Sequence, residues 1–192
     1  MSHFFAYLAR MKLIQRWGLM RNTCGENIQE HSLQVAMIAH GLAVIKNQFF
    51  EGTVDAERTA TLAVFHEVSE VITGDLATPI KYFNPEIKKA YGEIENVAKE
   101  KLFEMLPAAF KNEYRSLLFA DKDDSEHWIL VKAADKICAY LKCLEELKAG
   151  NLEFAKAEKA VKKEIKKFAL PEVEYFMQTF VPSFSLTLDE LD

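Results

Sequence analysis

The helical part of the segment from Leu62 to Pro79, which ends before Gly74, carries three ionisable side chains within an otherwise apolar pattern. His66 and Glu67 are neighbours about 100° apart around a helix, so both can approach one point in space. Glu70 falls one turn later and therefore on the same side. Ionisable groups on an apolar face are costly unless they have partners. A metal ion is one such partner, and a salt-bridge network is the alternative.

Two other segments place an ionisable residue where the pattern calls for an apolar one. His31 falls in the apolar stripe of a helix predicted over 28–47, and Asp135 interrupts the stripe of a helix predicted over 124–149. Either residue alone is typical of a buried side chain whose polar atoms have hydrogen-bond partners. Together with His66 and Glu67 they offer two imidazoles and two carboxylates, which suit a divalent cation. Four protein ligands would leave positions for water and substrate, as hydrolytic metal sites require.

Helical periodicity dominates the rest of the chain, and no segment has the pattern of a strand. The sequence therefore predicts an all-α fold, with one domain over residues 1–192. Asn84 followed by Pro85 is one of several helix-end signals. The predicted helices cover residues 2–15, 28–47, 55–73, 85–106, a shorter helix ending near 119, 124–149, 152–168 and a last helix after 171.

Composition narrows the function classes. The chain has 192 residues, 49% of them hydrophobic, and a net charge of −5. This acidic balance argues against binding to nucleic-acid polymers or membranes, but it is compatible with a small phosphate ligand held by one local arginine. There is no signal-peptide layout, and no apolar run approaches membrane-spanning length. Three cysteines without metal-like pairing favour a reducing compartment, so we expect a cytoplasmic protein.

These segments together resemble the HD-domain metal-dependent phosphohydrolases, and within them the bacterial 5′-deoxynucleotidase (YfbR-like) branch. The resemblance runs nearly end to end and is carried by Arg16–Trp17 and by residues 30–36, 66–83, 132–135, 139–147 and 176–184. Enzymes of that branch remove phosphate from deoxyribonucleoside 5′-monophosphates. The resemblance therefore implies an HD-domain helical bundle, this activity, a small deoxynucleotide as partner and a homodimer.

The resemblance also implies a role for each matching residue. The ligands of one divalent cation would be His31, His66, Glu67 and Asp135. Mixed nitrogen and oxygen ligands suit Mn, Co or a similar transition metal. Arg16 would neutralise the phosphate, and Glu70 would relay a proton; these two are the expected catalytic residues. The residues expected to contact substrate are Arg16, Trp17, His31, Glu67, Asp75 and Thr78.

One position departs from the family pattern. The family has Asp after the second metal histidine, whereas this chain has Glu67. The extra methylene adds about 1.3–1.5 Å of reach, and a carboxylate ligand must lie within a few tenths of an ångström of its ideal distance. We therefore expect weak or altered turnover, with metal affinity lowered less than turnover.

Three other interpretations stay open at this point. An HD hydrolase acting on nucleoside triphosphates would need further cations, and near the motifs the sequence offers Arg16, Arg21 and Lys81. A nucleotide-binding protein made inactive by Glu67 would bind metal without turnover. A helical protein with three structural polar pairs would bind no metal.

Overall fold

The computed structural model describes residues 1–81 and 83–191. Over these residues it contains helices and one isolated bridge between Gln15 and Asn27, in agreement with the predicted all-α fold. The helices are α1 (Phe4–Leu8), α2 (Ile28–Phe49), α3 (Ala56–Phe65), α4 (Glu70–Thr73), α5 (Thr78–Lys81), α6 (Pro85–Glu104), α7 (Ala108–Leu118), α8 (Ser125–Lys148), α9 (Ala155–Lys167) and α10 (Pro171–Thr179). Short 3-10 turns are η1 (Met11–Leu13), η2 (Leu152–Phe154), η3 (Val181–Ser185) and η4 (Leu188–Glu190).

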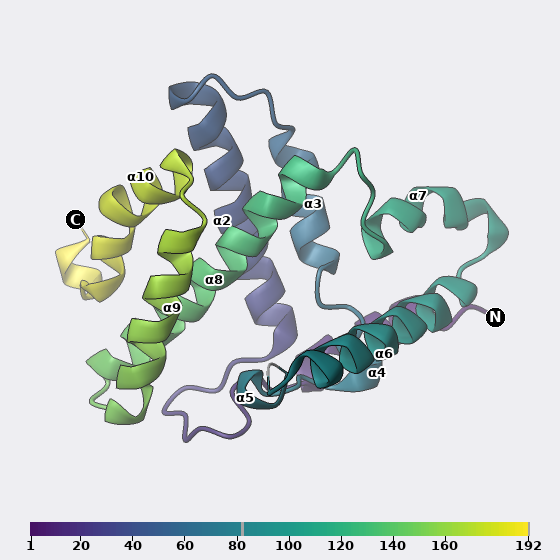
Figure 1. Cartoon of the computed structure of the whole chain (residues 1–192), viewed down its shortest axis with the longest axis horizontal. Helices are drawn as coiled ribbons and strands as arrows, with labels where there is room; N and C mark the ends of the chain where they lie inside the picture. Colours follow the sequence, from purple (N-terminus) through teal and green to yellow (C-terminus); the bar gives the residue numbers. More distant parts are fainter. Residues whose placement is uncertain (82, 192) are drawn as a thin grey trace.

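Helices α2, α3 and α8 form the centre of the molecule and contact one another (Figure 1). Helix α9 packs on α8, and α10 packs on α2. The main core between them is built from apolar side chains with little or no exposure, such as Val35, Leu42, Leu62 and Ile137. Within the described ranges, no helix combines the length and the apolar character needed to cross a membrane.

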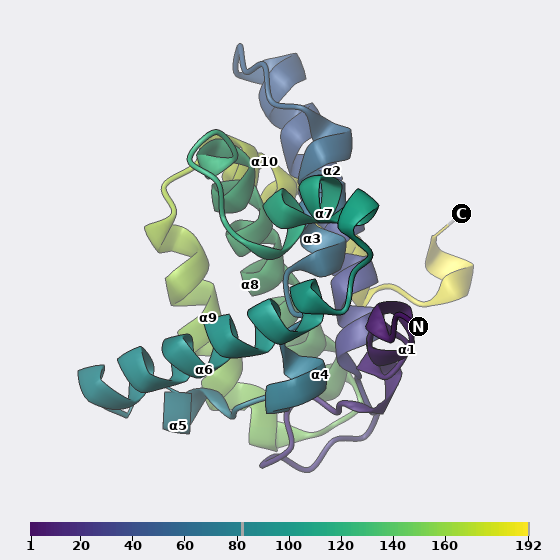
Figure 2. The same ribbon diagram turned by 90° about the vertical axis from the view of Figure 1, so that its right-hand side faces the viewer.

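A second apolar cluster joins the N-terminus to α6 and α7, on the side of the molecule away from α9 and α10 (Figures 1 and 2). Its buried members include Phe4 of α1, Ile28 at the start of α2, Val68 before α4 and Leu102 of α6. This cluster packs Val68, just before α4, and Val71, within it, together with Ile28 in the first turn of α2. It therefore fixes the segment after α3 relative to His31.

The start of α2 is set by a side-chain cap. The Asn27 Oδ1 accepts hydrogen bonds from the backbone N–H groups of Gln29 and Glu30, both at 3.0 Å. Such a cap satisfies donors that have no partner within the helix. It places His31 in the first turn of α2, facing inward.

The predicted helix over 2–15 is wrong beyond Leu8. Helix α1 ends there, η1 follows, and Ile14 has an extended backbone. The chain then pairs with the segment before α2: the N–H of Arg16 donates to the Glu26 carbonyl at 2.9 Å, and the N–H of Ile28 donates to the Ile14 carbonyl at 3.0 Å. These bonds need an extended chain, so the helix stops before Arg16.

The predicted helix over 55–73 is also interrupted. Helix α3 ends at Phe65, a turn follows over 66–69, and α4 begins at Glu70. The His66 Nδ1 lies 2.6 Å from the Ala63 carbonyl, the acceptor that a continuing α-helix would offer to the Glu67 N–H. The imidazole thus takes the place of a backbone donor. Glu70 consequently starts a new short helix instead of following His66 along one helical face.

Candidate metal centre

Four ionisable side chains from three parts of the chain converge near the N-terminal end of α2. One potential ligand atom from each of His31, His66, Glu67 and Asp135 lies within 4.8 Å of the other three. The His31 Nε2 is 3.1 Å from the Asp135 Oδ1, and the Glu67 Oε1 is 3.7 Å from the Nε2 atoms of both histidines. The expected convergence is therefore present, while the role of these residues as ligands stays a prediction.

The charge states of the cluster suit a cation. Burial lowers the pKa of His66, which favours the neutral imidazole. Burial would raise the pKa of Glu67, but the Arg16 guanidinium outweighs it and holds that pKa below its usual value. Burial likewise opposes ionisation of Asp135, but the hydrogen bond from His31 and the charge of Lys136 hold its pKa well below the usual range. Metal ligands must be deprotonated in this way.

The orientation of the His66 ring provides a further test of the fit. With its Nδ1 directed at the Ala63 carbonyl, the Nε2 points toward Glu67. This Nε2 is buried and has no hydrogen-bond partner among the described residues. A buried, unpaired imidazole nitrogen is costly without a partner, and an Nδ1–H bound to a carbonyl is the usual arrangement of a metal-binding histidine. The donor set therefore fits a divalent metal ion.

The loop before α2 brings Arg16 and Trp17 to the cluster. The Arg16 Nη1 donates to both carboxylate oxygens of Glu67, at 3.1 and 3.3 Å. Trp17 has φ = +59°, an uncommon conformation for a bulky residue. Its carbonyl accepts hydrogen bonds from the Met20 N–H at 2.9 Å and the Asn22 amide at 3.3 Å, which stabilise this backbone. The strained turn presents both side chains toward one cavity.

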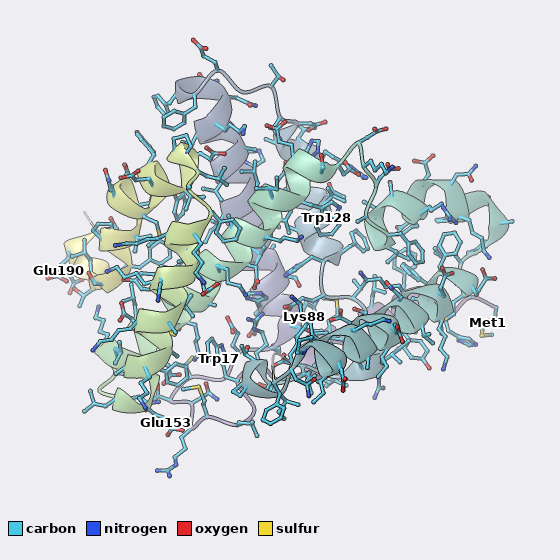
Figure 3. The ribbon with its side chains drawn as sticks, viewed as in Figure 1. Met1, Trp17, Lys88, Trp128, Glu153 and Glu190 are labelled. Carbon is cyan, nitrogen blue, oxygen red and sulfur yellow. The ribbon has the colours of Figure 1, made fainter. Side chains whose placement is uncertain are left out.

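This cavity has a volume of about 760 Å³. Its wall includes four residues expected to contact substrate, namely Arg16, Trp17, Asp75 and Thr78. Trp17, labelled in Figure 3, lies near α9, which contributes Lys156, Ala157, Ala160, Val161 and Glu164 to the cavity wall. None of the four clustered residues lines this cavity, but Arg16, which does, contacts the cluster through its hydrogen bonds to Glu67.

Apart from Arg16, the cations that line the cavity differ from those expected. Arg21 has a side chain that is 95% exposed, and Lys81 pairs with Glu95 at 2.9 Å; neither lines the cavity. Lys136 and Lys156 do line it, and the Lys136 ammonium lies 3.0 Å from the Asp135 Oδ2. Sequence reasoning missed both, and Lys156 was missed because it belongs to a lysine-rich helix whose pattern predicts a solvated face.

Glu70 lies close to the cluster but does not line the cavity. Its side chain is buried, and its Oε2 has no hydrogen-bond partner among the described residues. Burial, followed by the charges of Glu67 and Asp75, raises the pKa of Glu70 to about 9. At neutral pH this carboxyl group therefore holds a proton that it can donate.

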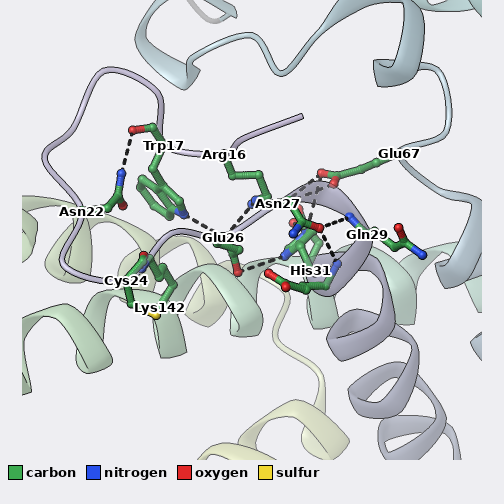
Figure 4. Close-up of polar contacts among 12 residues, drawn as sticks. Arg16, Trp17, Asn22, Cys24, Glu26, Asn27, Gln29, His31, Glu67 and Lys142 are labelled. Carbon is green, nitrogen blue, oxygen red and sulfur yellow. Dashed lines mark hydrogen bonds and ion pairs between the residues drawn. The ribbon is translucent and has the colours of Figure 1, made fainter. Parts of the chain in front are cut away.

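Glu26 joins the site although nothing in the sequence pointed to it. Figure 4 shows its carboxylate between Arg16 and Trp17 on one side and His31 on the other. It lies in a polar connection five residues before His31, where no apolar pattern reveals an unusual acid.

Comparison with known proteins places this site in a family. Residues 3–184 match the model of the family described as 5′-deoxynucleotidase YfbR-like. A 5′-deoxynucleotidase of Vibrio cholerae is 58% identical over 190 residues, which cover 99% of this chain and 98% of that protein. A 5′-deoxynucleotidase of Yersinia pestis (strain Pestoides F) is 58% identical over 191 residues, covering 100% of this chain and 97% of that protein.

Solved structures share the fold. An HD-domain phosphohydrolase from Listeria innocua matches with a TM-score of 0.83 and 24% identity, over 95% of this chain and 88% of that one. The cyanophage S-2L HD phosphohydrolase, bound to dA and one catalytic Zn²⁺ ion, matches with a TM-score of 0.67 and 18% identity, over 93% and 96% of the two chains. This chain therefore belongs to the YfbR-like family of 5′-deoxynucleotidases, hydrolases with the HD-domain fold.

Proposed function

We propose that this enzyme removes the 5′-phosphate from deoxyribonucleoside 5′-monophosphates with the help of one divalent transition metal ion, such as Mn or Co. The observation that carries the proposal is the cluster of four ligand atoms within 4.8 Å, next to a cavity whose wall includes Arg16. The Zn²⁺ and dA held by the cyanophage phosphohydrolase support the same classes of metal and ligand.

The metal would be held by His31, His66, Glu67 and Asp135, and when bound it supplies a Lewis acid that activates water and polarises the phosphate. Hydrolysis forms a bond from the water oxygen to phosphorus, breaks the bond to the sugar O5′, and leaves O5′ in need of a proton. The protonated Glu70 is suited to supply that proton, and the proton that the attacking water loses then restores Glu70 to its protonated state. Its burial keeps this proton in place at neutral pH.

The chain's other site residues would bind and orient the nucleotide. Arg16 offers a planar fork of donors to the phosphate dianion. Trp17 provides a flat wall for the sugar or base, and Asp75 and Thr78 offer oxygen atoms to the sugar hydroxyl or phosphate. All four line the cavity. His31 and Glu67, as expected from the resemblance, would also contact the substrate at the metal.

We further propose that the whole chain, residues 1–192, acts as one catalytic domain, that it works in the cytoplasm, and that two copies associate as a homodimer. The partner of the site is then a small deoxynucleotide rather than a nucleic-acid polymer or a membrane. An acidic net charge of −5 supports this choice, because polymers of phosphate are repelled by it.

The direct test measures phosphate release from deoxy- and ribonucleoside monophosphates and from deoxynucleoside triphosphates, with Mn²⁺ or Co²⁺ and with a chelator. We expect release from deoxyribonucleoside monophosphates that the chelator abolishes. Arg16→Ala should lower kcat/KM by about two orders of magnitude while metal content is retained, because a charged phosphate contact is lost. Arg21→Ala is the matched control, since the Arg21 side chain is 95% exposed.

Each of the other possible results would support one of the alternative interpretations of this protein. Release from triphosphates alone would favour the triphosphate hydrolase, and metal binding without any turnover would favour the inactive nucleotide-binding protein. A protein that binds no metal at micromolar concentration would mean that the four clustered side chains are structural pairs.

A further inference from the structure

Glu26 contacts three of the residues assigned to the site without being a ligand or a cavity residue. Its side chain is 12% exposed, so the carboxylate is largely shielded from water. It lies in the loop that connects η1 to α2, one residue before the Asn27 cap. A buried carboxylate needs partners, and the side-chain partners of Glu26 among the described residues, Arg16, Trp17 and His31, all belong to the proposed active site.

Each oxygen of Glu26 faces a different part of the site. The Oε2 accepts a hydrogen bond from the Trp17 Nε1–H at 3.1 Å and lies 3.1 Å from the Arg16 Nε. The Oε1 lies 3.8 Å from the His31 Nδ1. The Glu26 backbone carbonyl also accepts the Arg16 N–H at 2.9 Å. One residue thus connects the substrate-binding loop to the first turn of α2.

The contact with Arg16 constrains the direction of its guanidinium. The Nε edge lies against Glu26, while Nη1 donates to Glu67. A guanidinium has five N–H donors in a fixed plane. Arg16 Nη1 is hydrogen-bonded to Glu67, whereas the Nε edge lies beside the charge of Glu26 without a hydrogen bond, and this arrangement leaves the remaining donors available to a phosphate. Without Glu26 the side chain can rotate about its bond to Glu67.

The contact with His31 involves its Nδ1, the ring nitrogen that does not face the proposed metal position. The His31 Nε2 faces Asp135 and Glu67, whereas the buried Nδ1 has no hydrogen-bond partner among the described residues and faces the Glu26 carboxylate. A carboxylate on the far side of a metal-binding imidazole favours a proton on that nitrogen and leaves the other free for the metal.

We propose that Glu26 is the positioning residue of this active site. It orients the Arg16 guanidinium toward the substrate phosphate, fixes the Trp17 indole as a cavity wall, and holds His31 with its Nε2 directed at the metal. This inference rests on the proposed function for the roles of Arg16 and Trp17, but the contacts on which it depends belong to the structure of the chain itself.

The test compares Glu26→Gln and Glu26→Ala with the parent. The amide of Glu26→Gln keeps the size of the side chain and an oxygen that can accept from Trp17, but it removes the charge that faces Arg16 and His31. We expect its KM for dAMP to rise, and its Kd for Mn²⁺ measured by calorimetry to weaken, each by about tenfold. The tryptophan emission should stay as in the parent.

Glu26→Ala should reproduce both effects and also shift the emission of Trp17 to longer wavelength, because the indole loses its partner. The Trp17→Phe variant identifies the emission of Trp128, the other of the two tryptophans. Glu153→Gln is the matched control: Glu153 contacts the same loop at Arg21, 3.8 Å away, and touches none of the three site residues. It should leave all three readouts unchanged.

The outcomes separate this inference from the proposed function. An active parent whose Glu26 variants keep the parental KM and Kd for Mn²⁺ would overturn the role of Glu26 alone. A parent without phosphatase activity would overturn the proposed function, and the Mn²⁺ affinity and Trp17 emission of the variants would still decide the role of Glu26. If both variants have a lower melting temperature, and their kcat falls by the same factor as their KM rises, Glu26 has a folding role and the inference is overturned.

Discussion

Glu67 has two kinds of partner in the structure. Its oxygens accept from Arg16 at 3.1 and 3.3 Å, and its Oε1 lies 3.7 Å from the Nε2 atoms of His31 and His66. The longer side chain therefore spans both the proposed phosphate anchor and the proposed metal position. These contacts suggest how Glu67 could disturb turnover more than metal binding, as expected from the sequence, because the same carboxylate also occupies the proposed phosphate-binding side chain of Arg16.

We predict that Glu67→Asp raises kcat. The shorter arm restores the reach of the Asp that the resemblance implies at this position and frees Arg16 Nη1 from its contact with both carboxylate oxygens, whereas a misplacement of order 1 Å can cost about a hundredfold in rate. Glu67→Ala should lose metal affinity, because one of the two anions that balance the cation disappears. Phosphate release under saturating Mn²⁺ or Co²⁺, with the three forms side by side, measures this. A Glu67→Asp enzyme slower than the parent would show that the site is adapted to the longer side chain.

The proposed metal ligands, to which the sequence pattern itself pointed, share one property: they interrupt an apolar pattern. His31 and Asp135 stand where a core residue is expected, and that is why their convergence could be predicted. Glu26 and Lys156 lie in polar segments, where one more charge is no anomaly. Their part in the site depends on which loops and helices meet, and a one-dimensional pattern does not contain that information.

At the scale of elements, the loop over residues 14–27 is held by a buried ion pair on α8. Glu146 has no exposed surface and lies 2.5 Å from the Lys142 ammonium. It accepts hydrogen bonds from the N–H and hydroxyl of Thr23 and from the N–H of Cys24, and Lys142 donates to the Cys24 carbonyl. This pair ties the loop that carries Arg16 to the C-terminal half of α8.

We predict that Glu146→Ala destabilises the protein by about 3–5 kcal/mol, because it leaves the buried Lys142 charge without its partner. Glu145→Ala, on the exposed side of the same helix, should change stability by less than about 0.5 kcal/mol. Urea unfolding followed by circular dichroism measures both. Equal stability of the two variants would mean that the pair contributes no net stabilisation.

The pH dependence of this effect has a defined sign. Burial would raise the pKa of Glu146, but the bonds from Lys142 and Thr23 outweigh it and hold that pKa below the usual 4.5. The carboxylate therefore contributes its stability above pH 4.5 and loses it as the pH falls further. The difference in stability between the parent and Glu146→Ala should shrink in that acidic range.

Most helices could be predicted from the sequence, since the apolar period and caps such as Asn27 and Asn84 act locally. The two wrong predictions have tertiary causes. Helix α1 stops early because residues 14–16 pair with a segment ten to fourteen residues further along the chain, and α3 stops because the His66 ring takes the Ala63 carbonyl. Each break positions a residue of the proposed site, Arg16 in the first case and His66 in the second. The local pattern therefore fails where the site requires a non-helical backbone.

At the scale of the whole molecule, the outer face of α2 is a candidate surface for association between two copies of the chain. Although α2 is the central helix, it exposes Leu33, Met37 and Val44, with exposed fractions of 55%, 63% and 39%. Their spacing of four and seven residues places them on one face. We call this face the α2 stripe. Leu33 also borders a hollow of about 630 Å³ whose wall includes Phe5 and Val64.

Single exposed apolar residues are ordinary, but a stripe that continues into an apolar hollow is typical of an interface. We therefore predict that the homodimer forms through the α2 stripe, and that light scattering finds twice the chain mass of 22.0 kDa. Met37→Glu should give a monomer, because a charge would be buried at the contact. Ile94→Glu, at a 54% exposed position on α6, is the control and should remain dimeric. Dissociation by Ile94→Glu alone would move the interface to α6, and a parent that is monomeric at tens of micromolar would contradict the dimer itself.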